Sequence, residues 1–83
     1  MNTYPTYSDY LGQVNHLIDS NELTVEQGVI LLSCYKGTLE RTPVHINYLM
    51  NASGLGWKQV NYTLNGLVLR GAIKRMDEKY YMV

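Results

Sequence analysis

Apolar residues recur three and four positions apart in four stretches of the chain, which is the spacing of one face of a helix. The last stretch differs, because basic and aromatic residues there flank a short acidic turn. This pattern predicts four helices followed by a two-stranded hairpin, a mainly α fold of the α+β class. The expected bounds are about 9–20, 25–36, 42–50 and 56–70 for the helices and 72–83 for the hairpin.

Short sequence signals mark where the helices begin and end. Ser8 is expected to cap the first helix with its hydroxyl oxygen. Residues 24–27 have the Thr-x-x-Gln spacing of a capping box. Gly37 is expected to end the second helix, and Thr42-Pro43 to begin the third, because proline lacks an N–H that the first turn leaves unpaired. Residues 38–42 are then a link or a short strand.

The helical spacing also assigns an inner side to each helix, since apolar residues on one stripe are expected to turn towards the core. The residues assigned in this way are Leu11, Val14, Leu17 and Ile18 in the first helix, Val25, Val29, Leu32 and Tyr35 in the second, Val44, Tyr48 and Leu49 in the third, and Trp57, Val60, Leu64, Leu67 and Val68 in the fourth.

Length and composition narrow the class of protein. At 83 residues and 9.5 kDa the chain is expected to form a single domain over 1–83, with residues 1–7 as a tail. The longest apolar run has four residues, far below the roughly 20 that span a bilayer. With no secretory leader at the first residues, these features predict a cytoplasmic protein that makes no contact with a membrane.

Candidate catalytic and metal-binding chemistry is sparse. The single cysteine, Cys34, excludes an internal disulfide and is expected to pack in the core. His16 and His45 are far apart in sequence and lack a third ligand at a useful spacing, so we expect no metal and no cofactor. The carboxylates are spread along helices without partner residues. We therefore expect that the chain is not an enzyme.

The charges are divided along the chain although they sum to zero. Residues 1–35 hold four acidic residues and no Lys or Arg, whereas residues 36–83 hold all seven basic residues and three acidic ones. Between Arg41 and Met76 there are five basic residues and no acid, if these two ends are included. This division predicts two functional faces, with the basic face in the second half of the chain.

The second half has the order helix, short turn, longer helix and basic hairpin, which is typical of a helix-turn-helix at 42–70 with a wing at 72–83. Polar residues lie opposite the apolar stripe of the fourth helix, and Asn, Gln and Lys side chains can hydrogen-bond to base edges. Basic residues at the start of the hairpin can contact phosphates. The predicted DNA-binding residues are Lys58, Gln59, Asn61, Tyr62, Asn65, Lys74 and Arg75.

Two segments carry a resemblance to a known family. Residues 23–27, Leu-Thr-Val-Glu-Gln, and residues 67–75, Leu-Val-Leu-Arg-Gly-Ala-Ile-Lys-Arg, resemble the start of the second helix and the passage from recognition helix to wing in MarR-like members of the winged-helix superfamily. The resemblance covers about residues 23–83. It implies a transcriptional regulator that binds specific duplex DNA sequences, usually as a dimer.

Two further expectations concern protein partners. Tyrosines at 4, 7 and 10 and the apolar residues of the first helix predict a homodimer interface there, because tyrosine is enriched at interfaces. The alternative function is a protein-binding adaptor, which zero net charge and the apolar end of the fourth helix favour. It would use that end or the acidic N-terminal helices. The predicted interface residues are Tyr7, Tyr10, Leu11, Val14 and Leu69.

Overall fold

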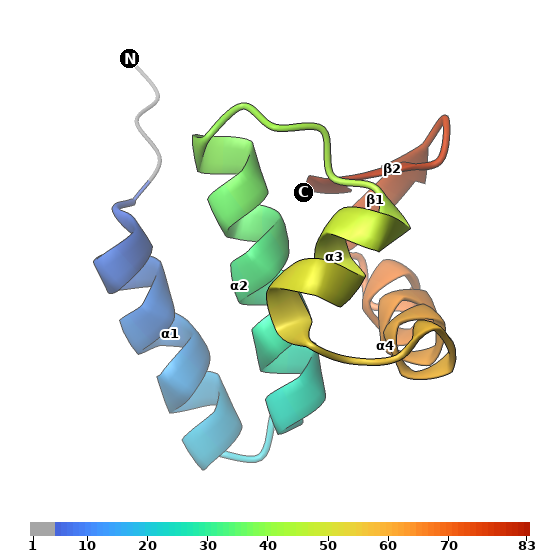
Figure 1. Ribbon diagram of the computed structural model, residues 1–83. Helices are drawn as coiled ribbons and strands as arrows, with labels where there is room; N and C mark the ends of the chain where they lie inside the picture. Colours follow the sequence, from blue (N-terminus) through green and yellow to red (C-terminus); the bar gives the residue numbers. More distant parts are fainter. Residues whose placement is uncertain (1–4) are drawn as a thin grey trace.

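The computed structural model describes residues 5–83, which form four helices and a two-stranded antiparallel hairpin (Figure 1). This confirms the expected class, mainly α with a small β part. The elements are α1 (Tyr7–Asp19), α2 (Val25–Leu39), α3 (Ile46–Ser53), α4 (Trp57–Leu69), β1 (Ile73–Met76) and β2 (Lys79–Met82).

The N-terminal ends of α1 and α2 are both held by threonine caps. Thr6, and not Ser8, caps α1, since its Oγ1 accepts a hydrogen bond from the backbone N–H of Asp9 at 3.1 Å. The helix therefore begins inside the stretch expected to be a tail, of which residues 1–4 lie outside the described part of the chain. The capping box of α2 is confirmed, because Thr24 and Gln27 exchange two hydrogen bonds of 2.9 and 3.1 Å.

The end of α2 and the start of α3 differ from the sequence expectation. Gly37 does not end α2 but is buried inside it, where a Cβ atom would lie 2.5 Å from Cγ2 of Val44. Residues 42–45 do not begin a helix either. Val44 accepts a backbone hydrogen bond from Tyr80 of β2 at 2.8 Å, which keeps this segment extended, so α3 begins only at Ile46.

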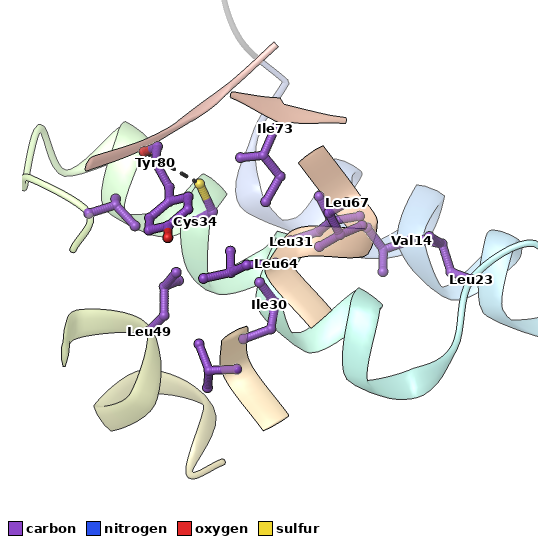
Figure 2. Close-up of a cluster of buried hydrophobic side chains, with 12 residues drawn as sticks. Val14, Leu23, Ile30, Leu31, Cys34, Leu49, Leu64, Leu67, Ile73 and Tyr80 are labelled. Carbon is purple, nitrogen blue, oxygen red and sulfur yellow. Dashed lines mark hydrogen bonds between the residues drawn. The ribbon is translucent and has the colours of Figure 1, made fainter. Parts of the chain in front are cut away.

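The core surrounds α2, which contacts α1, α3, α4 and the hairpin (Figure 1). Figure 2 shows side chains from all six elements pointing into it, with Leu64 and Leu67 of α4 meeting Ile30 and Leu31 of α2. Three residues expected in the core are exposed instead, Val25 at 60%, Trp57 at 59% and Val68 at 37%. Val25 and Trp57 are each the first residue of a helix, so their side chains lie beyond the edge of the core. Val68 lies in the last turn of α4, at the margin of its buried stripe.

Cys34 and Tyr80 close the core between α2 and the hairpin. The Cys34 thiol is fully buried and lies 3.9 Å from the carbonyl oxygen of Tyr80, as Figure 2 shows. Burial raises the pKa of the Cys34 thiol to about 11, because the charged thiolate is disfavoured away from water. The expected packing role of this cysteine is confirmed.

The last turn of α4 is tied to the turn between α1 and α2. The Arg70 guanidinium donates a hydrogen bond of 2.8 Å to the carbonyl oxygen of Glu22, and its Nη1 lies 3.5 Å from Oε1 of Gln27. Arg70 thus has a structural role. Within residues 5–83, no helix combines the length and the apolar character needed to cross a bilayer.

Candidate nucleic-acid interface

A tight turn sets α4 against α3. Gly54 follows α3 with a φ of 74°, a left-handed conformation that glycine adopts without strain, and its N–H donates to the carbonyl oxygen of Met50 at 2.9 Å. Gly56 then precedes the first turn of α4. The helix, turn and helix expected over 42–70 are therefore present, although they span the shorter range from Ile46 to Leu69.

The two sides of α4 have different chemistry. Val60, Leu64 and Leu67 are buried on its inner side. At 100° per residue, the opposite side carries four residues that are all exposed, with Tyr62 at 82% and Leu69 at 87%. We call this row, which consists of Lys58, Tyr62, Asn65 and Leu69, the outer ridge.

The other two predicted residues of α4 flank the outer ridge. Gln59 lies on the side of α2 and lines a groove of about 550 Å³ between α4 and the first turn of α2, together with Tyr62, Leu69 and Glu26. Asn61 lies on the opposite flank and is half-buried. Its Nδ2 donates to the carbonyl oxygen of Trp57 at 3.1 Å, so one of its donors is already engaged within the helix.

A second concave surface lies where α3, α4 and the hairpin meet. This hollow of about 370 Å³ brings Trp57 and Asn61 of α4 together with Arg75 of β1. The Arg75 guanidinium lies 6.0 Å from the ring centroid of Tyr80, at the outer limit of a cation–π contact. We call this concave surface the hairpin hollow. Its full lining is His45, Ile46, Asn47, Trp57, Asn61, Arg75, Glu78 and Tyr80.

Sequence reasoning missed the exposed Trp57, which it placed in the core. A signal was available, because the preceding Gly54-Leu55-Gly56 turn makes this tryptophan the first helical residue, where a side chain lies outside the helical packing. His45 and Asn47 were missed as well. They line the hollow because α3 begins at Ile46 and not at Thr42-Pro43, where the sequence predicted its start.

Lys74 and Arg75 do not share one surface. Successive residues of a strand point to opposite faces, and in the register of the hairpin Lys74 pairs with Tyr81 while Arg75 pairs with Tyr80. Tyr80 is the buried one of the two tyrosines. Arg75 therefore lies on the face towards the core and the hairpin hollow, and Lys74 lies on the outer face.

The tip of the hairpin is acidic. Asp77 and Glu78 have φ values of 52° and 63°, as the two central residues of a tight I′ turn require. Both are exposed. A phosphate group at the tip would meet two carboxylates, so a contact between hairpin and phosphate is favourable only nearer to Arg75.

The residues predicted for a partner interface do not form one surface. Val14 is 1% exposed and belongs to the core, which corrects its assignment to an interface. Tyr10 stacks on Tyr35 with ring centroids 4.1 Å apart, and burial is the main cause that raises the pKa of Tyr10 to about 12. Tyr7 lies beside the last turn of α2, whereas Leu69 lies beside its first turn.

The remaining residues of α1 considered for this interface have mixed exposure. Tyr7 is exposed and Leu11 is half-buried. Tyr4, the first tyrosine of the series, lies outside the described residues. Among residues 5–83, no three His, Cys, Asp or Glu side chains are grouped closely enough to hold a metal ion.

Comparisons with known proteins found no matching family model, no matching curated protein and no matching solved structure. Any functional assignment therefore depends on the chemistry of the exposed residues. Lys58, Tyr62 and Asn65 lie together on the outer ridge, Arg75 and Asn61 meet in the hairpin hollow, and Lys74 lies apart from both.

Proposed function

We propose that this chain is a winged helix-turn-helix domain that binds duplex DNA, with α4 in the major groove and the hairpin beside the phosphate backbone. The outer ridge is the observation that carries the proposal. Lys58, Tyr62 and Asn65 follow one another at helical spacing opposite the buried side of α4. Within the described chain, none of these three side chains makes a hydrogen bond, so their donors and acceptors are available to a ligand.

The dimensions of the ridge suit a major groove. An α-helix fits the groove, which is about 12 Å wide. From Lys58 to Asn65 the helix rises about 10 Å at 1.5 Å per residue, and this length matches about three base pairs at 3.4 Å each. An asparagine such as Asn65 can pair with adenine through two hydrogen bonds, and a lysine such as Lys58 can donate to guanine or to a phosphate.

The hairpin hollow supplies the positive charge for a phosphate beside the groove. Arg75 points into it, next to Asn61 and His45, and a guanidinium is well suited to phosphate oxygens. Glu78 of the acidic tip lines the same hollow, so the phosphate contact is expected on the side formed by Arg75, His45 and Asn61. With a net charge of zero the domain lacks a general attraction to DNA, so we expect a modest affinity whose salt dependence reflects only the few phosphates that its basic residues contact.

Fluorescence anisotropy with a mixed-sequence duplex, measured across a salt series, tests the proposal. Each neutralised phosphate contributes about −0.9 to the slope of log K against log salt. We expect Lys58→Ala and Arg75→Ala each to weaken binding and to reduce the slope by about one. Lys74→Ala is the matched control, since it removes the same charge from the outer face of the same strand.

Two outcomes would contradict this arrangement. No binding at about 50 mM salt, where even non-specific contacts register, would remove DNA as a ligand. Equal losses from Arg75→Ala and Lys74→Ala would exclude the hairpin hollow as the place of phosphate contact.

One observation favours a protein-binding adaptor as the second candidate. Tyr62 and Leu69 expose most of their surface beside the groove between α4 and α2, and Gly66 leaves space between them. Large exposed apolar side chains around a groove suit an apolar side chain of another protein. An adaptor predicts no salt-dependent binding of the duplex and no effect of Lys58→Ala, so the same titration separates the two functions.

A further inference from the structure

A row of mostly apolar residues along α2 is only partly covered by the described chain, and its midpoint Leu32 also packs against the edge of the core. Val25 is the most exposed, Leu39 is exposed as well, and Val29 and Leu32 are half-buried. Lys36 completes the row, which runs at intervals of four, three, four and three residues. This is the spacing with which one helix packs along another. We call these five residues the α2 seam.

The seam is unusual because α2 is the central helix of the fold. Figure 1 shows α1 on one side of α2 and α3, α4 and the hairpin on the other. Sequence analysis expected Val25, Val29 and Leu32 to face the core, but Ile30 and Leu31 are buried in their place. The helix is therefore apolar on two sides, and an apolar side lowers the free energy only when another surface covers it.

We propose that the α2 seam packs against the same seam of a second copy of this chain, with the two helices antiparallel and a two-fold axis passing beside Leu32. Leu32 is the midpoint of the seam, seven residues from Val25 and seven from Leu39. An isologous contact requires such a self-complementary patch. In this register Leu32 meets its own copy and Val25 meets Leu39 of the second copy.

The two ends of the seam have complementary shapes. A shallow hollow of about 350 Å³ lies at the C-terminal end of α2, lined by Tyr7, Lys36, Leu39 and Glu40. Val25 is the most exposed apolar residue of the seam and projects from its other end. The antiparallel register places Val25 of each copy at the hollow of the other, so both hollows are filled at once.

The charges of α2 agree with the same register. Lys36 is the only basic residue among residues 1–40. It lies about 6 Å beyond Leu32 along the helix axis, and Glu26 lies about 9 Å before Leu32. In the antiparallel pair, Lys36 of one copy and Glu26 of the other lie at nearly the same height, but Glu26 is half-buried and faces the groove beside α4, about 80° around the helix from Lys36. These charges are compatible with the register, whereas the apolar spacing and the two hollows are the evidence for it.

This inference goes beyond DNA binding and is independent of it. The outer ridge belongs to α4 and the seam to the uncovered side of α2, so each surface can be tested while the other is left intact.

Sedimentation equilibrium over a range of protein concentrations tests the association. We expect a species of twice 9.5 kDa that dissociates on dilution. Val25→Glu and Leu32→Glu should each weaken dimerisation at least tenfold, because both place carboxylates in an apolar contact. Leu69→Glu is the matched control and should leave the dimer unchanged. Val25→Glu keeps the test valid if Leu32→Glu fails to fold, since residue 25 is exposed at 60%.

Disulfide trapping tests the register. Under oxidising conditions, Leu32→Cys should form a covalent dimer, because the two-fold axis brings residue 32 next to its own copy. Val25→Cys should not, because seven residues on each side of the axis separate it from its copy by about 21 Å. The chain without a new cysteine is the control. Its native Cys34 is buried, so we expect no disulfide between two copies through this residue.

Three results would overturn the proposal. The first is a monomer at every concentration. The second is a dimer that Val25→Glu leaves intact or that Leu69→Glu dissociates. The third is Val25→Cys forming a covalent dimer as readily as Leu32→Cys, which would require parallel helices.

Discussion

α2 and α4 turn their inner sides into the same core, but their uncovered sides offer different chemistry. The outer ridge of α4 is mostly polar, with Lys58 and Asn65 free to donate hydrogen bonds. The uncovered side of α2 is mostly apolar, with Leu32 at its centre. A polar side is stable in water until a ligand replaces the water, whereas an apolar side gains stability from being covered. One small fold thus presents two exposed helix sides of opposite chemistry.

The comparison depends on α4 having one buried and one exposed side, and two of its leucines test this. Leu64 is fully buried, so Leu64→Ala should reduce the free energy of unfolding by about 2–5 kcal/mol. Leu69→Ala on the outer ridge should change it by less than about 0.5 kcal/mol. Urea unfolding of both variants provides the measurement. Similar losses from the two changes would show that the outer ridge is also packed.

A pH titration sharpens the comparison for α2, whose covered side includes Cys34. The pKa of this thiol rises from 9.0 to about 11 on folding. The contribution of the protonated thiol to the free energy of unfolding is therefore fully present below pH 9 and is lost as pH rises towards 11. The loss should approach about 3 kcal/mol, because the shift spans two units of pKa at 1.36 kcal/mol each. Urea unfolding at pH 8, 9, 10 and 11 measures it.

Two changes serve as controls for this titration. Cys34→Ala should be less stable at every pH but should lose the slope between pH 9 and 10. The pKa of Tyr10, raised from 10.0 to about 12, adds a fall above pH 10 that Tyr10→Phe should reduce. Burial also raises the pKa of Tyr48, so part of this fall should remain in Tyr10→Phe. A slope between pH 9 and 10 that persists in Cys34→Ala would show that a group other than Cys34 causes it.

Two helical glycines locate the closest contact of α2. At Gly37 a Cβ atom would overlap Val44, so Gly37→Ala should destabilise the fold by about 1–3 kcal/mol. At Gly12 of α1 nothing lies within 4 Å, so Gly12→Ala should stabilise it by up to about 1 kcal/mol. Thermal unfolding compares the two. A stabilising Gly37→Ala would show that Val44 can move away from α2.

The order and type of the elements were predictable because each depends on local spacing. The capping box at 24–27 and the turn glycine at 54 act within a few residues and are visible in the sequence. The errors arise where a distant contact overrides a local preference. Gly37 resembles a helix end in the sequence, but it allows α2 to approach Val44 closely. Thr42-Pro43 resembles a helix start, but the next residue, Val44, is hydrogen-bonded to Tyr80 of β2.

The candidate site was predictable only on α4, where one period of 3.6 residues decides which side chains face outward. Lys58, Tyr62 and Asn65 follow from that period alone. The hairpin hollow combines residues from α3, α4 and the hairpin. No local sequence pattern predicts that Trp57 and Arg75 lie in the same hollow. The α2 seam was read as core because a helix that is apolar all round gives no sign of which side its own domain covers.

The contact between Tyr80 and α2 also determines how this chain can reach its folded state. Helices and a hairpin form within microseconds, because their contacts are local. The core is complete only when the Tyr80 ring and carbonyl reach Cys34, a contact between residues 46 positions apart. Closing so long a loop is entropically unfavourable before any burial compensates for it. We therefore expect docking of the hairpin, rather than helix formation, to limit the rate of folding.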